Sequence, residues 1–140
     1  MSLLLINARI VKEEEILDGY AIYIEGERIH SILPEEEAHK LNPKKILDVQ
    51  GRFVTPGFID THSDMVEQLV QPRPTSLLDF DLAIKEGERQ FVNQGITTMY
   101  HSLSFYDDSF DGVKEIRKAR NVLKLADAIE RTHEKSHLIH

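Results

Sequence analysis

The chain has 140 residues, of which 41% are hydrophobic and 29% charged, and these fractions are typical of a globular protein. The net charge of −7 argues against a nucleic-acid-binding surface, which would show a stripe of basic residues. Cysteine is absent, so disulfides and thiolate metal sites are excluded, and a metal ion would need histidine, carboxylate or water ligands.

The sequence shows no secretory or membrane-spanning segment. Met1–Ile6 is apolar, but Asn7 and Arg9 interrupt the run long before the roughly 20 apolar residues that a membrane span needs. We therefore expect a cytoplasmic protein that has neither a membrane nor a nucleic acid as its partner.

Residues 1–56 are predicted to form a small antiparallel β unit of the β-sandwich type. The pair Asp18-Gly19 is expected to break the chain, and Gly26 predicts a hairpin turn. The glutamates at 35–37 indicate a solvated loop or a short helix face. Strands are expected at Leu3–Val11, Tyr20–Ile24, Arg28–Leu33 and Ile46–Val49.

The stretch Phe53–Asp64 is the most informative part of the chain. Thr55–Gly57 predicts a turn, after which apolar residues begin a new strand. Side chains alternate along a strand, so Asp60, His62 and Asp64 would point to the same side. An imidazole and a carboxylate that converge at a strand end, here from His62 and Asp64, can hold a divalent metal ion. The alternative is a structural histidine, because an isolated H-x-D pattern is common.

Strand and helix signals alternate after residue 57. Asp79 is expected to cap a helix that runs to Asn93 or Gln94, with Gly95 at its end. Residues 96–102 are predicted to form a buried strand, and residues 137–140 begin what could be a third. A second helix is expected over Val113–Arg131, with its apolar stripe at Val113, Ile116, Ala119, Val122, Leu123, Ala126 and Ile129.

This alternation predicts βαβ units and a parallel sheet, the fold class of an α/β barrel. His62 and Asp64 would close the first strand of that sheet, and His101 would close the second. In (β/α) barrels the active site lies at the carboxyl ends of the strands. The architecture and the candidate ligands therefore agree.

The pattern V-T-P-G-F-I-D-x-H-x-D at residues 54–64, after a small β unit and before strand–helix repeats, resembles the amidohydrolase superfamily of metal-dependent barrel hydrolases. Most members carry H-x-H where this chain has His62-Ser63-Asp64. That departure, with Glu67, Pro72-Arg73-Pro74 and Gly95–Thr98, resembles one subgroup, the diphosphatases of the carbon–phosphorus lyase pathway. Met65 departs from the subgroup, which often has Asn there, and His101 stands where several members carry Asp.

The resemblance implies a TIM-like barrel that begins at residue 57 and is incomplete at residue 140. It implies a divalent metal ion, foremost zinc, with manganese or iron as alternatives, held by His62 and Asp64. The implied reaction hydrolyses alpha-D-ribose 1-methylphosphonate 5-triphosphate, a phosphorylated small molecule, to the 5-phosphate and pyrophosphate. Arg73 and Glu67 would bind substrate, and His101 would lie at the mouth of the site; a surface arginine that stiffens the loop is the other reading of Arg73.

Two other functions stay open, a hydrolase of C–N bonds in cyclic amides or amidines and a non-catalytic fragment or interaction module. A closed barrel needs about 250 residues, so the catalytic residues and remaining ligands are expected beyond His140, and the 140 residues alone are expected to be inactive. The uncovered sheet edge predicts a homo-oligomer, with segment swapping as one form of it.

Overall fold

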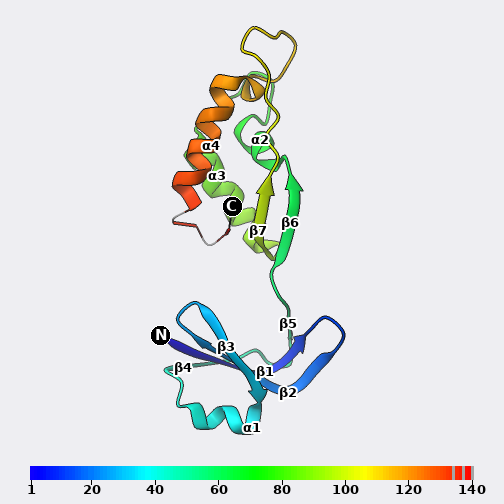
Figure 1. Ribbon diagram of the computed structural model, residues 1–140, viewed down its shortest axis with the longest axis vertical. Coiled ribbons are helices and arrows are strands. Elements are labelled where there is room, and N and C mark those ends of the chain that lie inside the picture. Colours follow the sequence, from blue (N-terminus) through cyan, green and yellow to red (C-terminus); the bar gives the residue numbers. More distant parts are fainter. Residues whose placement is uncertain (134, 137, 140) are drawn as a thin grey trace. The chain divides into compact units, whose positions relative to one another are not determined.

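The computed structural model describes residues 1–133, 135–136 and 138–139. It divides the chain into two compact units, Met1–Pro56 and Gly57–His140 (Figure 1). Within the described residues, no helix is both long and apolar enough to cross a lipid bilayer.

The first unit is built on one five-stranded sheet with β1 at its centre. On one side β1 pairs antiparallel with β2, and β2 forms the predicted hairpin with β3, in which Ile24 is paired with Ile29. On its other side β1 pairs parallel with β4 and β5. The five strands are β1 (Ser2–Val11), β2 (Ile16–Glu25), β3 (Arg28–Pro34), β4 (Lys45–Asp48) and β5 (Phe53–Val54).

Two details of this unit differ from the sequence-based expectation. Asp18-Gly19 lies inside β2 and does not end it. The pairing of β2 with β1 shifts register at this point, and Gly19 adopts a φ of +77°. Glycine accommodates this backbone conformation because it has no Cβ atom. The sheet also packs against helix α1 (Glu35–Ala38), which is followed by the 3₁₀ turn η1 (His39–Leu41), and not against a second sheet: Ala38 is fully buried with Leu4.

The second unit has the predicted alternation of strands and helices, and the α/β fold class is confirmed. β6 (Phe58–Ser63) and β7 (Ile96–His101) are parallel neighbours. Ile139 forms a parallel bridge to Thr98, so a third strand begins as expected; His137 and His140 lie outside the described residues. The helical elements are α2 (Met65–Val70), α3 (Phe80–Asn93), the 3₁₀ turn η2 (Glu115–Arg117) and α4 (Ala119–His133).

Helix α3 begins and ends as its sequence predicts. The Asp79 carboxylate accepts a hydrogen bond of 2.9 Å from the backbone N–H of Leu82, which satisfies a donor that the first turn would otherwise leave open. At the other end Gly95 has a φ of +83°, the left-handed conformation typical of the residue after a helix.

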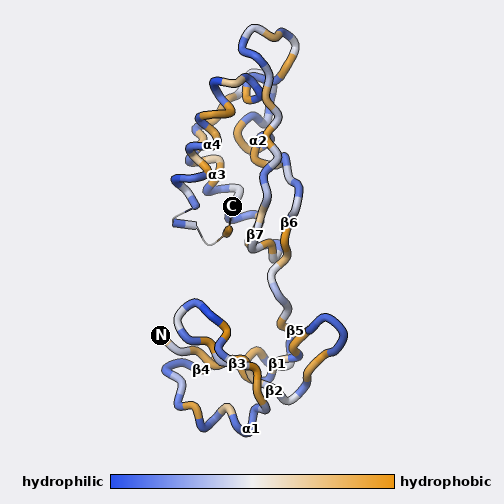
Figure 2. The backbone as a smooth tube through the Cα atoms, in the orientation of Figure 1, coloured by the Kyte–Doolittle hydropathy of each residue, from blue (hydrophilic) through white to orange (hydrophobic). Residues whose placement is uncertain are grey.

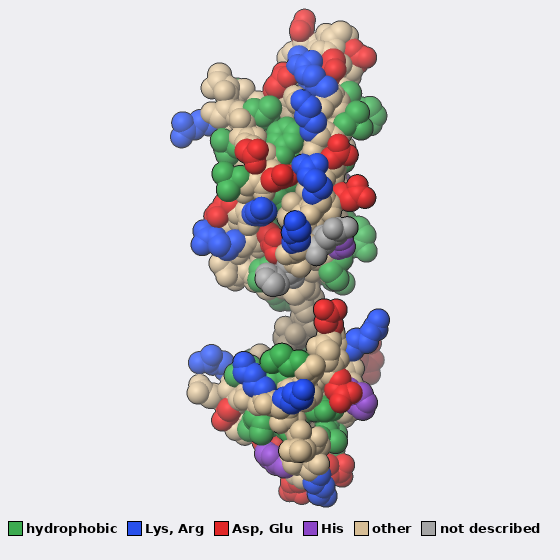
Figure 3. All heavy atoms as spheres, turned by 90° about the vertical axis from the view of Figure 1, so that its left-hand side faces the viewer, with side chains coloured by type: hydrophobic (Ala, Val, Ile, Leu, Met, Phe, Trp, Pro, Cys, Tyr) green, Lys and Arg blue, Asp and Glu red, His purple; other side chains and the backbone are tan. Residues whose placement is uncertain are grey.

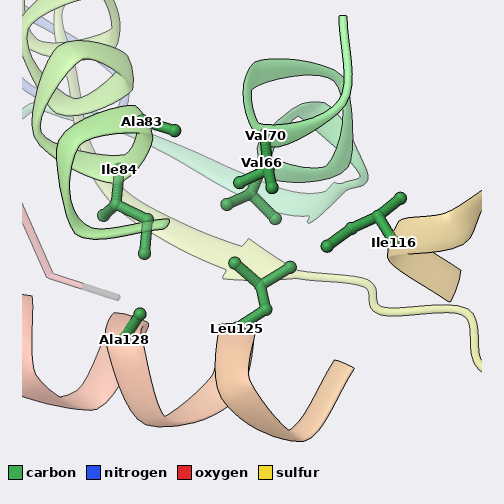
Figure 4. Close-up of a cluster of buried hydrophobic side chains, with 7 residues drawn as sticks. All are labelled: Val66, Val70, Ala83, Ile84, Ile116, Leu125 and Ala128. Atoms are coloured by element: carbon green, nitrogen blue, oxygen red, sulfur yellow. The ribbon is translucent and has the colours of Figure 1, made fainter. Parts of the chain in front are cut away.

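The core of the second unit lies between its helices (Figure 4). It brings together buried residues of all three α-helices and of η2: Val66, Val70, Ala83, Ile84, Ile116, Leu125 and Ala128. In Figure 2, apolar and polar residues alternate along α3 and α4, as expected for helices that bury one side.

Three sequence-based expectations for this unit were wrong. Helix α4 starts at Ala119, because the residues before it form the separate turn η2. Its buried positions are Asn121, Leu125, Ala128 and Thr132. Of the predicted stripe, Ile129 packs against the core, but Leu123 is 68% exposed. Successive residues of a helix are rotated by about 100° around its axis. Apolar residues spaced three and four apart therefore show that the helix has an apolar face, but they do not decide which of two adjacent faces packs inward. β7 is half exposed, with Tyr100 open to solvent.

Candidate active site

The carboxyl ends of β6 and β7 meet at one edge of the second unit. Ser63, the last residue of β6, is paired with His101, the last residue of β7. The chain stays paired for one further residue, because the backbone N–H of Ser102 donates to the carbonyl of Ser63 over 2.7 Å. Every side chain predicted for the site, except that of Arg73, comes from the ends of these strands or from the first turn that follows β6.

His62 projects into solvent from the end of β6. Its Nδ1 lies 3.0 Å from the hydroxyl oxygen of Ser102, and its backbone N–H donates to the Asp60 carboxylate over 3.2 Å. Since the contact with Ser102 uses Nδ1, Nε2 is the ring nitrogen left to bind a metal ion. A polar partner on one nitrogen orients the ring for ligation by the other.

Asp64 is exposed and lies just beyond the strand. Its backbone φ of −101° and ψ of 10° are not those of a strand, because the chain turns here into α2. The pairing of β6 with β7 also shifts register between Asp60 and Ser63, so the regular alternation predicted for Asp60, His62 and Asp64 does not continue to Asp64. Although Asp64 occupies the position before the first turn of α2, its carboxylate makes no capping hydrogen bond with that turn.

His62 and Asp64 fit part of a metal site. An imidazole nitrogen and a carboxylate are ligands that zinc and manganese accept, and a catalytic zinc site usually has three protein ligands and one open position. Over residues 1–133, 135–136 and 138–139, histidine and acidic side chains nowhere gather in a group of three able to hold a metal ion. Within those residues, His62 and Asp64 remain the two donors that the sequence predicts.

Glu67 lies one helical turn beyond Asp64 and is almost completely buried, at 2% exposed. Its Oε2 accepts a hydrogen bond of 2.7 Å from Nε of Arg117, and its Oε1 accepts one of 3.1 Å from the backbone N–H of Ser104. Both carboxylate oxygens are thus engaged by the segment that follows β7. The structure places Glu67 beneath the site, where it holds another element in position.

Gln71 repeats this arrangement one turn further along the chain. It is 4% exposed, its Oε1 accepts from the backbone N–H of Ile116, and its Nε2 donates to the carbonyl of Pro74, both over 2.9 Å. Residues four apart lie on the same side of a helix, so Glu67 and Gln71 form one polar edge of α2. This edge binds both ends of the long β7–α4 connection.

Arg117 is the cation of this buried network. The hydrogen bond and the charge of Glu67 raise the pKa of the Arg117 guanidinium above its ordinary value, and smaller contributions come from Tyr106 and Asp64. The Arg117 side chain is 28% exposed, against 3% for that of Glu67. Nε is held by Glu67, whereas the Nη nitrogens are not among the described buried side-chain atoms that lack a hydrogen bond, so they reach the surface.

Arg73 and His101 lie apart from this network. Arg73 is exposed in the loop after α2, where its backbone forms a bridge with Ser76. His101 lines an open groove of about 430 Å³ between β7 and α4, together with Met99 and Ile129. Successive residues of a strand face opposite sides, which explains why Ser102 meets His62 whereas His101 turns toward α4.

The roles of Ser102, Gln71 and Arg117 were not predicted from the sequence. A helical signal was available for α2, because Val66 and Val70 are four apart, as are Glu67 and Gln71. No local signal links Glu67 with a residue 50 positions later. The ion pair depends on the long-range packing of η2 against α2.

No protein-family model matches the chain. The alpha-D-ribose 1-methylphosphonate 5-triphosphate diphosphatase of Escherichia coli strain K12 is 26% identical over 129 residues, which are 92% of this chain and 32% of that enzyme. An imidazolonepropionase of Chromobacterium violaceum is 39% identical over 51 residues, 36% of this chain and 12% of that enzyme. The chain thus spans a third or less of the curated relatives that it matches.

The fold matches part of several solved enzymes. The N-acetylglucosamine-6-phosphate deacetylase of Pasteurella multocida superimposes with a TM-score of 0.70 over all of this chain and 32% of its own, at 18% identity. A structure described as an amidohydrolase gives a TM-score of 0.56 at 25% identity, over 72% of this chain and 25% of its own. In sequence the chain is similar to part of these enzymes, and in fold it is similar to part of solved enzymes that include an amidohydrolase, so it resembles proteins of the amidohydrolase superfamily.

Proposed function

We propose that the chain provides the first metal ligands of a metal-dependent hydrolase that converts alpha-D-ribose 1-methylphosphonate 5-triphosphate to its 5-phosphate and pyrophosphate. The observation that carries the proposal is the position of His62 and Asp64 at the carboxyl end of β6. The likeness to the diphosphatase of Escherichia coli supports the substrate class, because it extends over 92% of the chain.

A divalent ion, when bound, activates a water molecule and offsets negative charge on phosphoryl oxygens. The residues of this chain prepare that chemistry. Ser102 orients the ring of His62, and Asp64 contributes a carboxylate that no helix cap has engaged. Since an open zinc site needs three protein ligands, we infer that further donors lie outside the described residues.

A second candidate is hydrolysis of a C–N bond in a cyclic amide or amidine. It is favoured by the 39% identity to an imidazolonepropionase, which is higher than the identity to the diphosphatase but covers 51 residues. An assay of the enzyme that contains this chain separates the two candidates. Release of pyrophosphate from the ribose triphosphate supports the first, and ring opening of a cyclic amide without pyrophosphate release supports the second.

The metal site can be tested on the chain itself by titrating zinc and following the side-chain signals of histidine by NMR. We expect zinc to perturb His62 and to bind at least about tenfold more weakly to His62→Ala and Asp64→Asn, since each removes one of two donors. His39→Ala is the matched control, because His39 is an exposed histidine of η1. Equal weakening by all three variants, or no response of His62, would contradict the proposal and favour a non-catalytic module.

The remaining sequence-based predictions concern the isolated chain. With two donors in its described residues it is expected to bind zinc weakly and not to cleave a triphosphate, which a phosphate-release assay measures. We also propose that it forms a homo-oligomer in the cytoplasm, and the mass in solution by light scattering tests the oligomer.

A further inference from the structure

We propose that Arg117, and not Arg73, receives the oxyanion of the substrate, a phosphate group if the proposed function is correct. The inference rests on that function for the identity of the substrate but on the geometry of Arg117 for the role. Sequence spacing alone pointed to Arg73, which lies between two prolines.

Arg117 is anchored from below. Its Nε donates to the Glu67 carboxylate over 2.7 Å, and Glu67 is itself held by the backbone N–H of Ser104. The neighbouring residue Ile116 is fully buried, and its backbone N–H donates to Gln71. The backbone and the guanidinium of Arg117 are therefore both fixed by buried contacts with α2.

The anchor uses one of the five N–H donors of the guanidinium. Over the part of the chain that the structure describes, the bond from Nε to Glu67 is the one hydrogen bond that the Arg117 side chain makes. The two Nη groups keep four donors, and the side chain is 28% exposed. A planar guanidinium whose Nη edge is open is suited to bind a phosphate or carboxylate through two parallel hydrogen bonds.

Arg117 also lies within electrostatic range of the metal-binding candidate Asp64, whose charge contributes to its raised pKa. The carboxylate of Glu67, which is bonded to Nε, compensates the positive charge of Arg117. Binding of the substrate oxyanion by the two Nη groups therefore depends more on paired hydrogen bonds than on net charge. A cation bound at Asp64 would offset that carboxylate and leave the Nη edge free for the substrate.

The other arginines of this unit lack such an anchor. Arg73 is exposed, and Arg89, Arg120 and Arg131 pair with carboxylates that are between 39% and 48% exposed. Figure 3 shows basic and acidic side chains interspersed over one face of the unit, as expected for solvated surface charges. Binding by a side chain that is already ordered loses less conformational entropy, so Arg117 is the better receptor.

The experiment follows the Nε and Nη signals of arginine in the ¹⁵N-labelled chain during titration with pyrophosphate, without metal and at constant ionic strength set with potassium chloride. We expect the Nη signals of Arg117 to shift and saturate while those of Arg73 and Arg89 stay within the response to chloride. Arg117→Lys, which keeps the charge that faces Glu67, should weaken binding about tenfold because it loses the two-pronged donor. Arg89→Lys is the control and should change binding less than twofold.

Three results would overturn the proposal: saturable shifts at Arg73 and not at Arg117, binding by Arg117→Lys equal to that of the unchanged chain, or no binding of pyrophosphate. The backbone amide signal of Ser104 reports whether each variant keeps the Glu67 contact. If Arg117→Lys loses that contact, the side-chain shifts of the unchanged chain decide the matter. Because no metal or turnover is involved, failure here is separate from failure of the zinc titration.

Discussion

The two units bury different kinds of side chain. Residues 1–56 form small apolar clusters around β1 and β2, where Tyr23 is the one buried side chain with a polar group, a hydroxyl that donates to Glu25. The described part of the second unit buries five such side chains: Ser63, Glu67, Gln71, Asn121 and Thr132. Three of these five are close in sequence to the candidate ligands: Ser63 ends β6, Glu67 lies in α2, and Gln71 directly follows α2.

This difference shows where the chain uses buried polar groups to position a connection at the cost of some stability. A buried polar group needs a partner and adds little net stability when it has one, so apolar residues at these positions would give a folded state of equal or higher stability. The first unit has apolar side chains at all of its buried positions except Tyr23. In the second unit Glu67 and Gln71 direct the β7–α4 connection toward the carboxyl ends of the strands.

The largest effect is expected when a fully buried leucine at the centre of each unit's core is replaced by alanine. Leu125 is fully buried among residues from three helices and η2, and Leu4 is fully buried in the first unit. Each change to alanine should cost about 2 to 5 kcal/mol of unfolding free energy, from lost burial and the cavity left behind. We expect Leu125→Ala to lower hydrogen-exchange protection mostly in α3 and α4, and Leu4→Ala to lower it in β1 and β2. Equal losses in both units for either variant would contradict this division.

A smaller effect is expected from two ion pairs of equal length. Arg117–Glu67 and Lys12–Glu15 both have a nitrogen–oxygen distance of 2.7 Å, but the side chains of Lys12 and Glu15 are 48% and 56% exposed. Glu67→Gln should cost about 2 kcal/mol, less than the ~3 to 5 kcal/mol of a fully buried pair because Arg117 remains partly exposed to water. Glu15→Gln should cost less than about 0.5 kcal/mol.

Urea unfolding of both variants measures this contrast. The two substitutions are isosteric and remove the same charge, so the difference between them reports burial. If Glu67→Gln and Glu15→Gln cost the same, the buried network is not what fixes the β7–α4 connection, and the anchoring argued for Arg117 loses its basis.

The sequence predicted those features that local physics controls. Asp79 and Gly95 mark the two ends of α3 because capping and left-handed geometry are properties of single residues. The parallel order of β6 and β7 followed from the alternation of elements. The hairpin at Gly26 followed from its turn and the strand signals on both sides.

Features that depend on distant residues were not predictable. The helix face that includes Leu125 is chosen by α3 and α2, which approach it from elsewhere in the sequence. The partner of Glu67 lies 50 residues away, and the contact of His62 with Ser102 joins residues 40 positions apart. Helix α2 was missed although Val66 and Val70 are four apart, because six residues give less than two turns in which that spacing could repeat.

The finest test compares two aspartates that both precede a helix of the second unit. Asp79 accepts a hydrogen bond from the first turn of α3, whereas Asp64 makes no such bond with α2. Asp79→Ala should therefore lower the unfolding free energy by about 1 kcal/mol, the usual value of a lost cap, and Asp64→Ala should lower it by clearly less. Zinc affinity should respond in the opposite order, since Asp64 is a proposed ligand and Asp79 is not. Thermal unfolding with and without zinc measures both effects on the same samples. If Asp64→Ala destabilised the metal-free chain as much as Asp79→Ala, Asp64 would be a structural residue of α2, and the reason for assigning it to a metal ion would be lost.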